Sequence, residues 1–145
     1  MEIRELNTLE DMLPHLPVLQ EMYPNLDLES YQNMLTDMIP NNYAQIGVFI
    51  ASDCVAISGY WLATKLWCGR YLELDNVIVR ESARGSGVGK VIQQYLEEKA
   101  FELQCNIMVL DAYTTNFKAH RFYYNQGYAP RGFHFIKILD EEGLT

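Results

Sequence analysis

The chain has 145 residues, 49% of them hydrophobic, which is enough to bury one core, so we expect a single domain over residues 1–145. The net charge of −8 argues against nucleic acid as a partner, because proteins that bind a polyanion concentrate cations. No apolar run approaches the roughly 20 residues of a membrane span, the first residues are acidic, unlike a signal peptide, and the three cysteines lack metal-ligand spacing. These features predict a cytoplasmic protein that needs neither a membrane nor a metal.

The first 40 residues predict a strand followed by two helices. Residues 2–6 are suited to a strand, and Thr8 has the position of a cap on a helix that two prolines soon interrupt. Asp27 is the expected cap of a second helix over residues 28–39, where apolar side chains recur at helical spacing.

The middle of the chain alternates between strand and helix patterns. Residues 43–51 and 54–64 are rich in β-formers and predict an antiparallel hairpin. A further strand is expected over residues 71–79. It is followed by a helix over residues 87–103, whose apolar residues share one face.

The last third predicts strand, helix and strand. Residues 105–113 are typical of a buried strand. Asn116 is the expected cap of a short helix that ends at Gly127, and residues 132–139 are expected to form a strand that closes the sheet. The whole order predicts an α/β (α+β) fold with a mixed, mostly antiparallel sheet flanked by helices.

The alternation of side chains slips inside the strand over residues 71–79. In a regular strand Leu72 and Leu74 would face one side and Val77 and Val79 the other. The side that carries the apolar residues therefore changes at Asp75 and Asn76. Either a β-bulge interrupts the strand there, or the strand is buried on both faces, since Ile78 is apolar too.

Three glycines lie in residues 80–90, "RESARGSGVGK", between that strand and the next helix. A helix start offers backbone N–H groups and the positive end of its dipole, and glycine lets an anion approach closely. Arg84 and Lys90 flank the glycines, so the stretch predicts a phosphate or pyrophosphate site rather than a turn shaped by glycine alone. It departs from both the P-loop and the dinucleotide-binding patterns.

Two motifs resemble the GNAT family of N-acetyltransferases, and the resemblance covers residues 73–139. The phosphate-loop pattern of the family matches Arg84, Gly87 and Gly89. A second pattern matches Asn116, Ala119, Tyr123, Gly127 and Tyr128, with tyrosine in place of phenylalanine at the last position. The resemblance implies a single GNAT-like domain that uses acetyl-CoA, with a monomer or a homodimer as its state.

The resemblance also implies where coenzyme A binds. Its pyrophosphate would bind the backbone N–H groups of Arg84, Gly85, Ser86, Gly87, Val88, Gly89 and Lys90, and its pantetheine arm would lie along Val77, Ile78 and Val79. The thioester carbonyl would then sit near the amide of Ile78 or Val79. Asn116 either contacts pantetheine or only caps its helix.

The implied reaction moves an acetyl group from acetyl-CoA to a primary amine of a small molecule or peptide. Glu73 is the first candidate for the base that takes the amine proton, Asp75 is the second, and either carboxylate could instead bind the ammonium. Tyr123 is the candidate acid for the departing thiolate. Two alternatives remain: an acyl-CoA-binding or regulatory module without catalysis, and a phosphate-binding α/β domain unrelated to coenzyme A.

Overall fold

The computed structural model describes all residues from Met1 to Thr145, which form two compact units, Met1–Val109 and Leu110–Thr145. The larger unit holds four of the five α-helices and the whole sheet except Leu110, the last residue of the fifth strand. The prediction of one domain over residues 1–145 stays a prediction.

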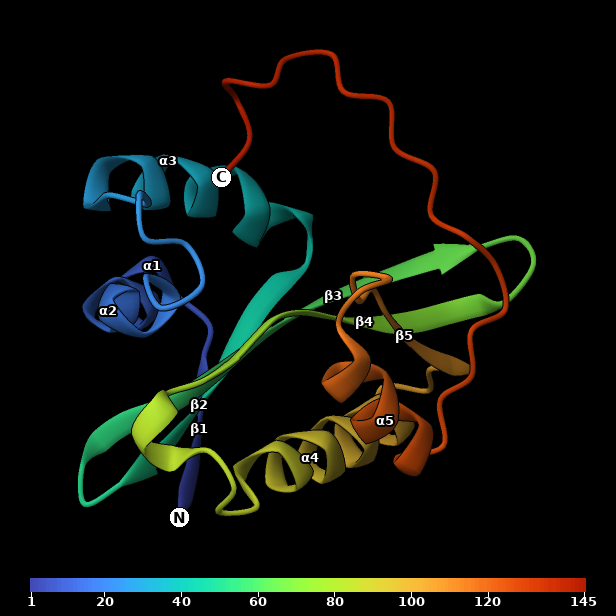
Figure 1. Cartoon of the computed structure of the whole chain (residues 1–145), viewed down its shortest axis with the longest axis horizontal. Coiled ribbons are helices and arrows are strands. Elements are labelled where there is room, and N and C mark those ends of the chain that lie inside the picture. Colours follow the sequence, from blue (N-terminus) through green and yellow to red (C-terminus); the bar gives the residue numbers. More distant parts are fainter. The chain divides into compact units, whose positions relative to one another are not determined.

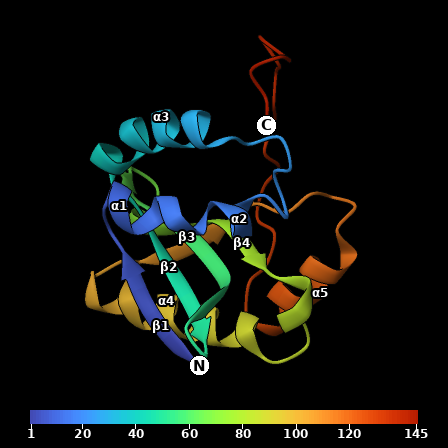
Figure 2. The ribbon, with the colours of Figure 1, turned by 90° about the vertical axis from the view of Figure 1, so that its left-hand side faces the viewer.

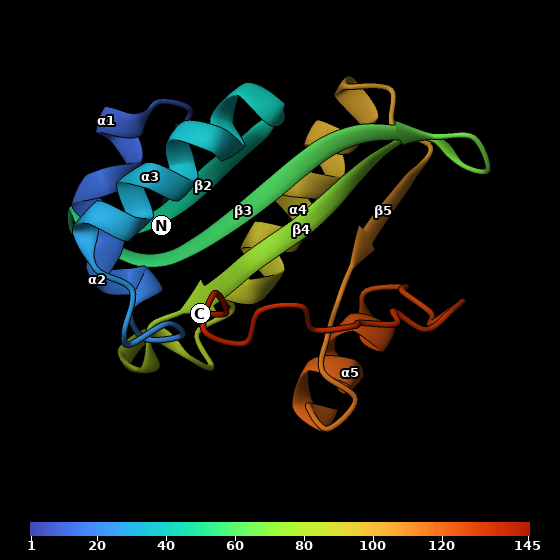
Figure 3. The same ribbon diagram turned by 90° about the horizontal axis from the view of Figure 1, so that it is seen from above.

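A five-stranded sheet in the order β1-β2-β3-β4-β5 is the frame of the fold (Figure 1). The strands are β1 (Glu2–Leu6), β2 (Tyr43–Ile50), β3 (Asp53–Lys65), β4 (Gly69–Val79) and β5 (Ile107–Leu110). The first four pair antiparallel with their chain neighbours, and β3 and β4 run side by side as a long hairpin (Figure 3). The Asn106 N–H donates to the Arg70 carbonyl (2.7 Å), so β4 and β5 begin at the same end of the sheet and run parallel. The sheet is mixed and mostly antiparallel, as predicted.

Helices cover both faces of this sheet. In the larger unit they are α1 (Leu9–Met12), α2 (Leu16–Leu19), α3 (Leu28–Met38) and α4 (Val88–Glu102). The smaller unit contains one further helix, α5 (Phe117–Asn125). Figure 2 shows α1, α2 and α3 on one side of the strands and α4 on the other. No helix is both long and apolar enough to cross a lipid bilayer.

The helix starts follow the capping signals of the sequence. Thr8 accepts the Asp11 N–H (3.2 Å), and the Asp11 carboxylate accepts the Thr8 N–H (3.0 Å). Asp27 accepts the Ser30 N–H (2.7 Å) at the start of α3. Pro14 lies in the short 3-10 helix after α1 and Pro17 in the first turn of α2, and they break the first helical segment into short pieces, as predicted.

Alternate residues of the central strands pack against opposite helical layers. Tyr43 and Ile57 belong to the core shared with Tyr31 and Leu35 of α3. The intervening residues face α4, as shown by the Lys99 ammonium, which lies 5.7 Å from the centre of the Tyr60 ring. Each central strand is therefore buried on both faces.

A β-bulge interrupts β4 at the point where the sequence pattern slips. Ile57 of β3 is opposite Ile78 and Gly59 is opposite Asp75, so β4 advances three residues while β3 advances two. The bulge includes Asn76, whose φ of 54° lies in the left-handed region. Of the two alternatives that the sequence leaves open for this strand, the bulge is confirmed. Because of the extra residue, Asp75 and Ile78 face the same side of the sheet.

Buried hydrogen bonds hold Asn76 in this conformation. The Tyr43 hydroxyl donates to Asn76 Oδ1 (2.9 Å), and Asn76 Nδ2 donates to the Tyr23 hydroxyl (2.9 Å). Gln45 Nε2 in turn donates to the hydroxyls of Tyr43 (3.0 Å) and Tyr31 (2.9 Å). The bulge is thus tied to β2, to α3 and to the segment between α2 and α3.

Close packing around Tyr43 keeps this network in place. Burial raises the pKa of the Tyr43 hydroxyl, so it stays a neutral donor. A Cβ on Gly59 would lie 2.3 Å from that hydroxyl, which leaves glycine as the residue that fits there.

The smaller unit, residues 110–145, contains the helix α5 and the last residue of β5. Asn116 caps α5 by accepting the Ala119 N–H (3.2 Å). The helix ends at Gly127 (φ 90°), where the Tyr128 N–H donates to the Tyr123 carbonyl (3.0 Å) and the two rings lie 5.6 Å apart. This Schellman ending explains the pattern that the sequence carries at these positions.

Two expectations for the last third of the chain need correction. The strand expected over residues 105–113 is restricted to β5 and is half-buried rather than buried. The strand expected over residues 132–139 is wrong, because those residues are irregular, and Phe135 and Leu139 are 90% and 91% exposed. The β-forming pattern there has no strand within residues 111–145 to pair with, and a strand needs a partner for its backbone groups.

We expect the left-handed conformation of Asn76 and its two side-chain bonds to contribute separately to stability. Asn76→Gly should lower the free energy of unfolding by about 1–3 kcal/mol, since the buried Tyr43 hydroxyl loses its acceptor. Asn76→Ala should cost about 1 kcal/mol more, because alanine also resists a positive φ. Urea unfolding of both variants measures the difference.

Gln104, an exposed residue with φ 58°, is the control: Gln104→Gly should not lower stability. Equal losses in Asn76→Gly and Asn76→Ala would contradict the prediction.

Candidate functional site

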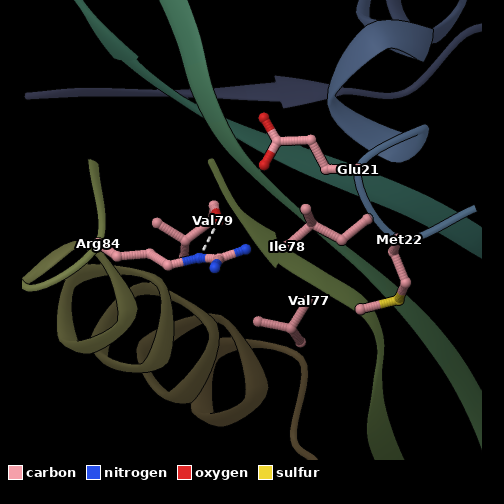
Figure 4. A pocket seen from close by; sticks show the side chains of 6 residues that line it. All are labelled: Glu21, Met22, Val77, Ile78, Val79 and Arg84. Carbon is pink, nitrogen blue, oxygen red and sulfur yellow. Dashed lines mark hydrogen bonds between the residues drawn. The ribbon is translucent and has the colours of Figure 1, made fainter. Parts of the chain in front are cut away.

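A hollow of about 310 Å³ follows the last three residues of β4 (Figure 4). One wall comes from the segment that joins α2 to α3, and Arg84 of the glycine loop lies at one end. The lining residues are Glu21, Met22, Val77, Ile78, Val79 and Arg84. Four of these six are residues that the sequence predicts to bind coenzyme A.

The backbone of β4 beside the hollow has one edge that faces away from β3. The Arg80 N–H donates to the Val55 carbonyl of β3 (2.9 Å), and groups that point to one neighbour recur at every second residue. The amide of Ile78 therefore also points to β3, whereas those of Val77 and Val79 point to the other edge. Of the two amides that the sequence leaves open for the thioester carbonyl, Val79 has the suitable direction.

The parallel strand β5 does not extend along this part of β4. The pairing starts where Asn106, just before β5, bonds Arg70 of β4, and β5 has four residues. Counted at one residue per step, it ends beside about Leu74, before the bulge. The outer edge of residues 77–79 is therefore not covered by β5. Part of it is used by Arg84, whose Nε donates to the Val79 carbonyl (3.1 Å).

The glycine loop uses left-handed backbone at two positions. Gly85 has φ 76° and Gly87 has φ 85°, and a Cβ at either would meet no atom within 4 Å. Glycine is required there by conformation rather than by crowding. Gly87 is also the N-cap residue of α4, with Gly89 in the first turn, so the loop opens directly into a helix start.

Some members of the predicted N–H set already have partners inside the loop. The Arg84 N–H donates to the Glu81 carbonyl (3.2 Å), and the Lys90 N–H donates to the Gly87 carbonyl (3.1 Å). Ser86 donates its hydroxyl to the Ala83 carbonyl. The amides of residues 85–89 are the remaining candidates for an anion.

Side chains around the loop differ in what they offer. Val88 is 1% exposed and packs in the core, so only its backbone is available, whereas the Lys90 side chain is exposed. The Arg80 Nε lies 3.9 Å from a Glu21 carboxylate oxygen, which places a carboxylate beside the loop as well.

The two candidate bases lie on β4 before the bulge, on the face that carries α1, α2 and α3. Glu73 is half-buried opposite Trp61, and the Trp61 Nε1 donates to Asp75 Oδ2 (2.8 Å). Glu73 precedes Val77 by four positions, about 13 Å along an extended strand, and Asp75 is about 7 Å nearer. A proton that moves from the hollow to Glu73 therefore needs intervening water.

Tyr123 and Asn116 belong to the other compact unit. Tyr123 lies in α5 with its ring 5.2 Å from that of Phe122 and 5.6 Å from that of Tyr128. Burial raises the pKa of the Tyr123 hydroxyl, which keeps it protonated at neutral pH. Asn116 is exposed, and its side chain is engaged as the helix cap.

Sequence reasoning missed Glu21 and Met22. Neither belongs to a motif, and they reach the hollow only because their segment crosses to β4 from more than fifty positions earlier in the chain. The one local signal was Tyr23, an aromatic residue in an irregular segment, which the structure bonds to Asn76.

Comparisons with known proteins agree with this fold. The model of the acetyltransferase (GNAT) family matches residues 10–128. An uncharacterized N-acetyltransferase of Methanocaldococcus jannaschii is 30% identical over 95 residues, which are 65% of this chain and 56% of that protein. The chain therefore spans little more than half of the length of that relative.

Solved structures share the fold at low identity. The ribosomal-protein-alanine N-acetyltransferase of Brucella melitensis has a TM-score of 0.81 at 19% identity, with 96% of this chain and 100% of that chain covered. An aminoglycoside N-acetyltransferase in complex with CoA has a TM-score of 0.79 at 15% identity, with 94% and 93% covered. Fold and family support acetyl transfer in general terms. The chain belongs to the acetyltransferase (GNAT) family.

Proposed function

We propose that the protein is an acetyl-CoA-dependent N-acetyltransferase that moves the acetyl group to a primary amine of a small molecule or peptide. The observation that carries the proposal is the hollow along residues 77–79, which leads from an uncovered strand edge to a glycine loop at a helix start. An extended ligand with a phosphate at one end fits that arrangement.

The pyrophosphate of acetyl-CoA binds at the amides of residues 85–89 in this proposal. Left-handed Gly85 and Gly87 turn the backbone without a Cβ, and the dipole of α4 favours an anion. Arg84 and Lys90 add positive charge. The shared fold of the aminoglycoside N-acetyltransferase with bound CoA supports this cofactor.

The pantetheine arm then lies along the outer edge of β4. The Val79 amide is the donor for the thioester carbonyl, and it stabilises the negative charge that develops on the oxygen as the amine attacks. Loss of one such donor in other enzymes costs about 10²–10³ in rate. Asn116 either contacts this arm or acts only as the cap of α5.

The amine nitrogen attacks the thioester carbon directly, and the C–S bond breaks as the amide forms. An alkyl amine with a pKa of about 10.4 is largely protonated at pH 7, so attack requires removal of a proton. Glu73 accepts that proton through water. The Tyr123 hydroxyl gives a proton to the departing thiolate and recovers it from solvent.

The acceptor is an amine whose identity is set outside the cofactor site. The two solved neighbours carry different acceptors in their names, a ribosomal-protein alanine and an aminoglycoside, at 19% and 15% identity. The net charge of −8 favours cationic acceptors over anionic ones. A turnover screen of amines with acetyl-CoA tests the proposal. Cofactor binding without turnover of any amine would instead indicate a non-catalytic acyl-CoA-binding module.

Coenzyme A should stabilise the protein, and ATP and NAD should not. At 100 times its Kd a ligand adds about 2.7 kcal/mol to the free energy of unfolding, which a thermal melt detects. Gly87→Val should abolish most of this gain, because its side chain occupies the space of the anion and resists the positive φ. Gly127→Val is the matched control, since it has the same kind of φ at the end of α5 and should lose stability but keep CoA binding. A wild-type melt unchanged by saturating CoA would exclude the cofactor.

Glu73→Gln should lower turnover most at pH values well below the pKa of the amine. As the pH rises toward that pKa, solvent deprotonates the amine and the need for a base disappears, so the ratio of wild-type to mutant kcat should approach one. Asp75→Asn is the comparison for the second candidate. An equal loss at every pH would assign Glu73 to acceptor binding or structure.

Tyr123→Phe should lower the rate of the chemical step by about 10²–10⁴-fold, with little change in the affinity for acetyl-CoA. The substitution removes only the hydroxyl and leaves the ring contacts with Phe122 and Tyr128. Single-turnover kinetics measure the step, and Tyr124→Phe serves as the control because Tyr124 is 57% exposed. Normal chemistry in Tyr123→Phe would rule out the acid role.

A further inference from the structure

The segment between α2 and α3, residues 20–26, forms a closed strap beside β4. Gln20 Nε2 donates to the Leu26 carbonyl (2.8 Å), which joins the two ends of the strap. The Met22 N–H donates to the carbonyl of Leu19, the last residue of α2 (3.0 Å), and within the strap the Leu26 N–H donates to the Tyr23 carbonyl (3.0 Å). The strap therefore has a defined backbone.

Two contacts fix the strap to β4 on either side of the hollow. The Tyr23 hydroxyl accepts from Asn76 Nδ2 (2.9 Å), just before residue 77. The Glu21 carboxylate accepts from the Glu81 N–H (3.2 Å), just after the strand ends. Met22 lies between these two tethers, so its position across residues 77–79 is set by its neighbours rather than by its own packing.

The side chain of Met22 is correspondingly open. It lines the hollow and is 48% exposed. Figure 4 shows it toward the Val77 end, with Arg84 at the opposite end beside Val79. The bond from Arg84 Nε to the Val79 carbonyl (3.1 Å) agrees with that order.

We propose that Met22 is a specificity-determining residue that limits the length of the acyl group the protein accepts. The inference rests on the proposed cofactor. With its pyrophosphate at the glycine loop and its thioester carbonyl at the Val79 amide, acetyl-CoA directs its acyl group away from Arg84, along the hollow toward Val77 and Met22. An acetyl group ends near Val79, and the additional methylenes of a longer acyl chain extend toward the Met22 side chain.

The chemistry of methionine fits a limit of this kind. Its unbranched thioether fills apolar space closely and has three rotatable bonds, so it disfavours longer chains without excluding them absolutely. Replacement by alanine removes three heavy atoms, about the space of the two additional methylenes in a butyryl group. Extra methylenes that do not fit a pocket cost about tenfold or more in affinity.

The test compares the binding of acetyl-CoA and butyryl-CoA by calorimetry, which needs no acceptor amine. Wild-type protein should prefer acetyl-CoA by about tenfold, and Met22→Ala should reduce this preference to about one. Met22→Leu conserves volume and should keep the wild-type preference. Met34→Ala is the matched control, since Met34 is 42% exposed on α3 and does not line the hollow.

The outcomes separate this inference from the proposed function. A preference unchanged in Met22→Ala, or affinities for both thioesters that fall equally, would overturn the role of Met22 and leave the cofactor assignment intact. Absence of binding by coenzyme A, acetyl-CoA and butyryl-CoA to the wild-type protein would overturn both. Equal wild-type affinity for the two thioesters would overturn the inference alone.

Discussion

The left-handed backbone of Asn76 is the constraint on which the candidate site depends. Its side-chain amide is held by Tyr43 on one side and bonds Tyr23 on the other, so the extra residue of β4 stays at one position. A one-residue shift of a strand exchanges its two faces. The bulge therefore determines that Val77 and Val79 direct their backbone groups away from β3. The same bonds position the strap, so one asparagine aligns both walls of the hollow.

Charge is distributed unequally along the strand that carries the site. The candidate bases Glu73 and Asp75 precede the bulge, whereas Arg80, Arg84 and Lys90 follow the last residue of β4. Although Glu21 also lies beside the loop, the three cations favour an anionic phosphate there, and the two carboxylates favour a cationic amine beside the middle of the strand. The distribution matches a reaction that joins a nucleotide-linked donor to an ammonium-bearing acceptor. It also accounts for a basic loop in a chain whose net charge is −8.

Local physics made much of this predictable from sequence. The caps at Thr8 and Asp27 fixed helix starts, and the break in side-chain alternation located the bulge, because both depend on neighbouring residues alone. Met22 was not predictable, since its place is set by bonds that its neighbours make to residues over fifty positions away. The sequence also left two amides open for the thioester, because their directions follow from pairing with β3. The expected strand over residues 132–139 failed for a related reason: its β-forming residues have no partner strand within residues 111–145.

The division between backbone and side-chain contacts explains how one fold can serve different acceptors. In the proposed complex the cofactor is bound chiefly by the amides of residues 85–89 and of Val79. Such contacts require only two left-handed glycines, a helix start and a bulge, which many sequences can supply. Solved structures at 15% and 19% identity share the fold, as expected when few positions need particular side chains. In this proposal Met22 selects among acyl groups, and Glu73 and Asp75 are the candidate bases for the amine. These side chains can be exchanged without moving the backbone that is proposed to bind the cofactor.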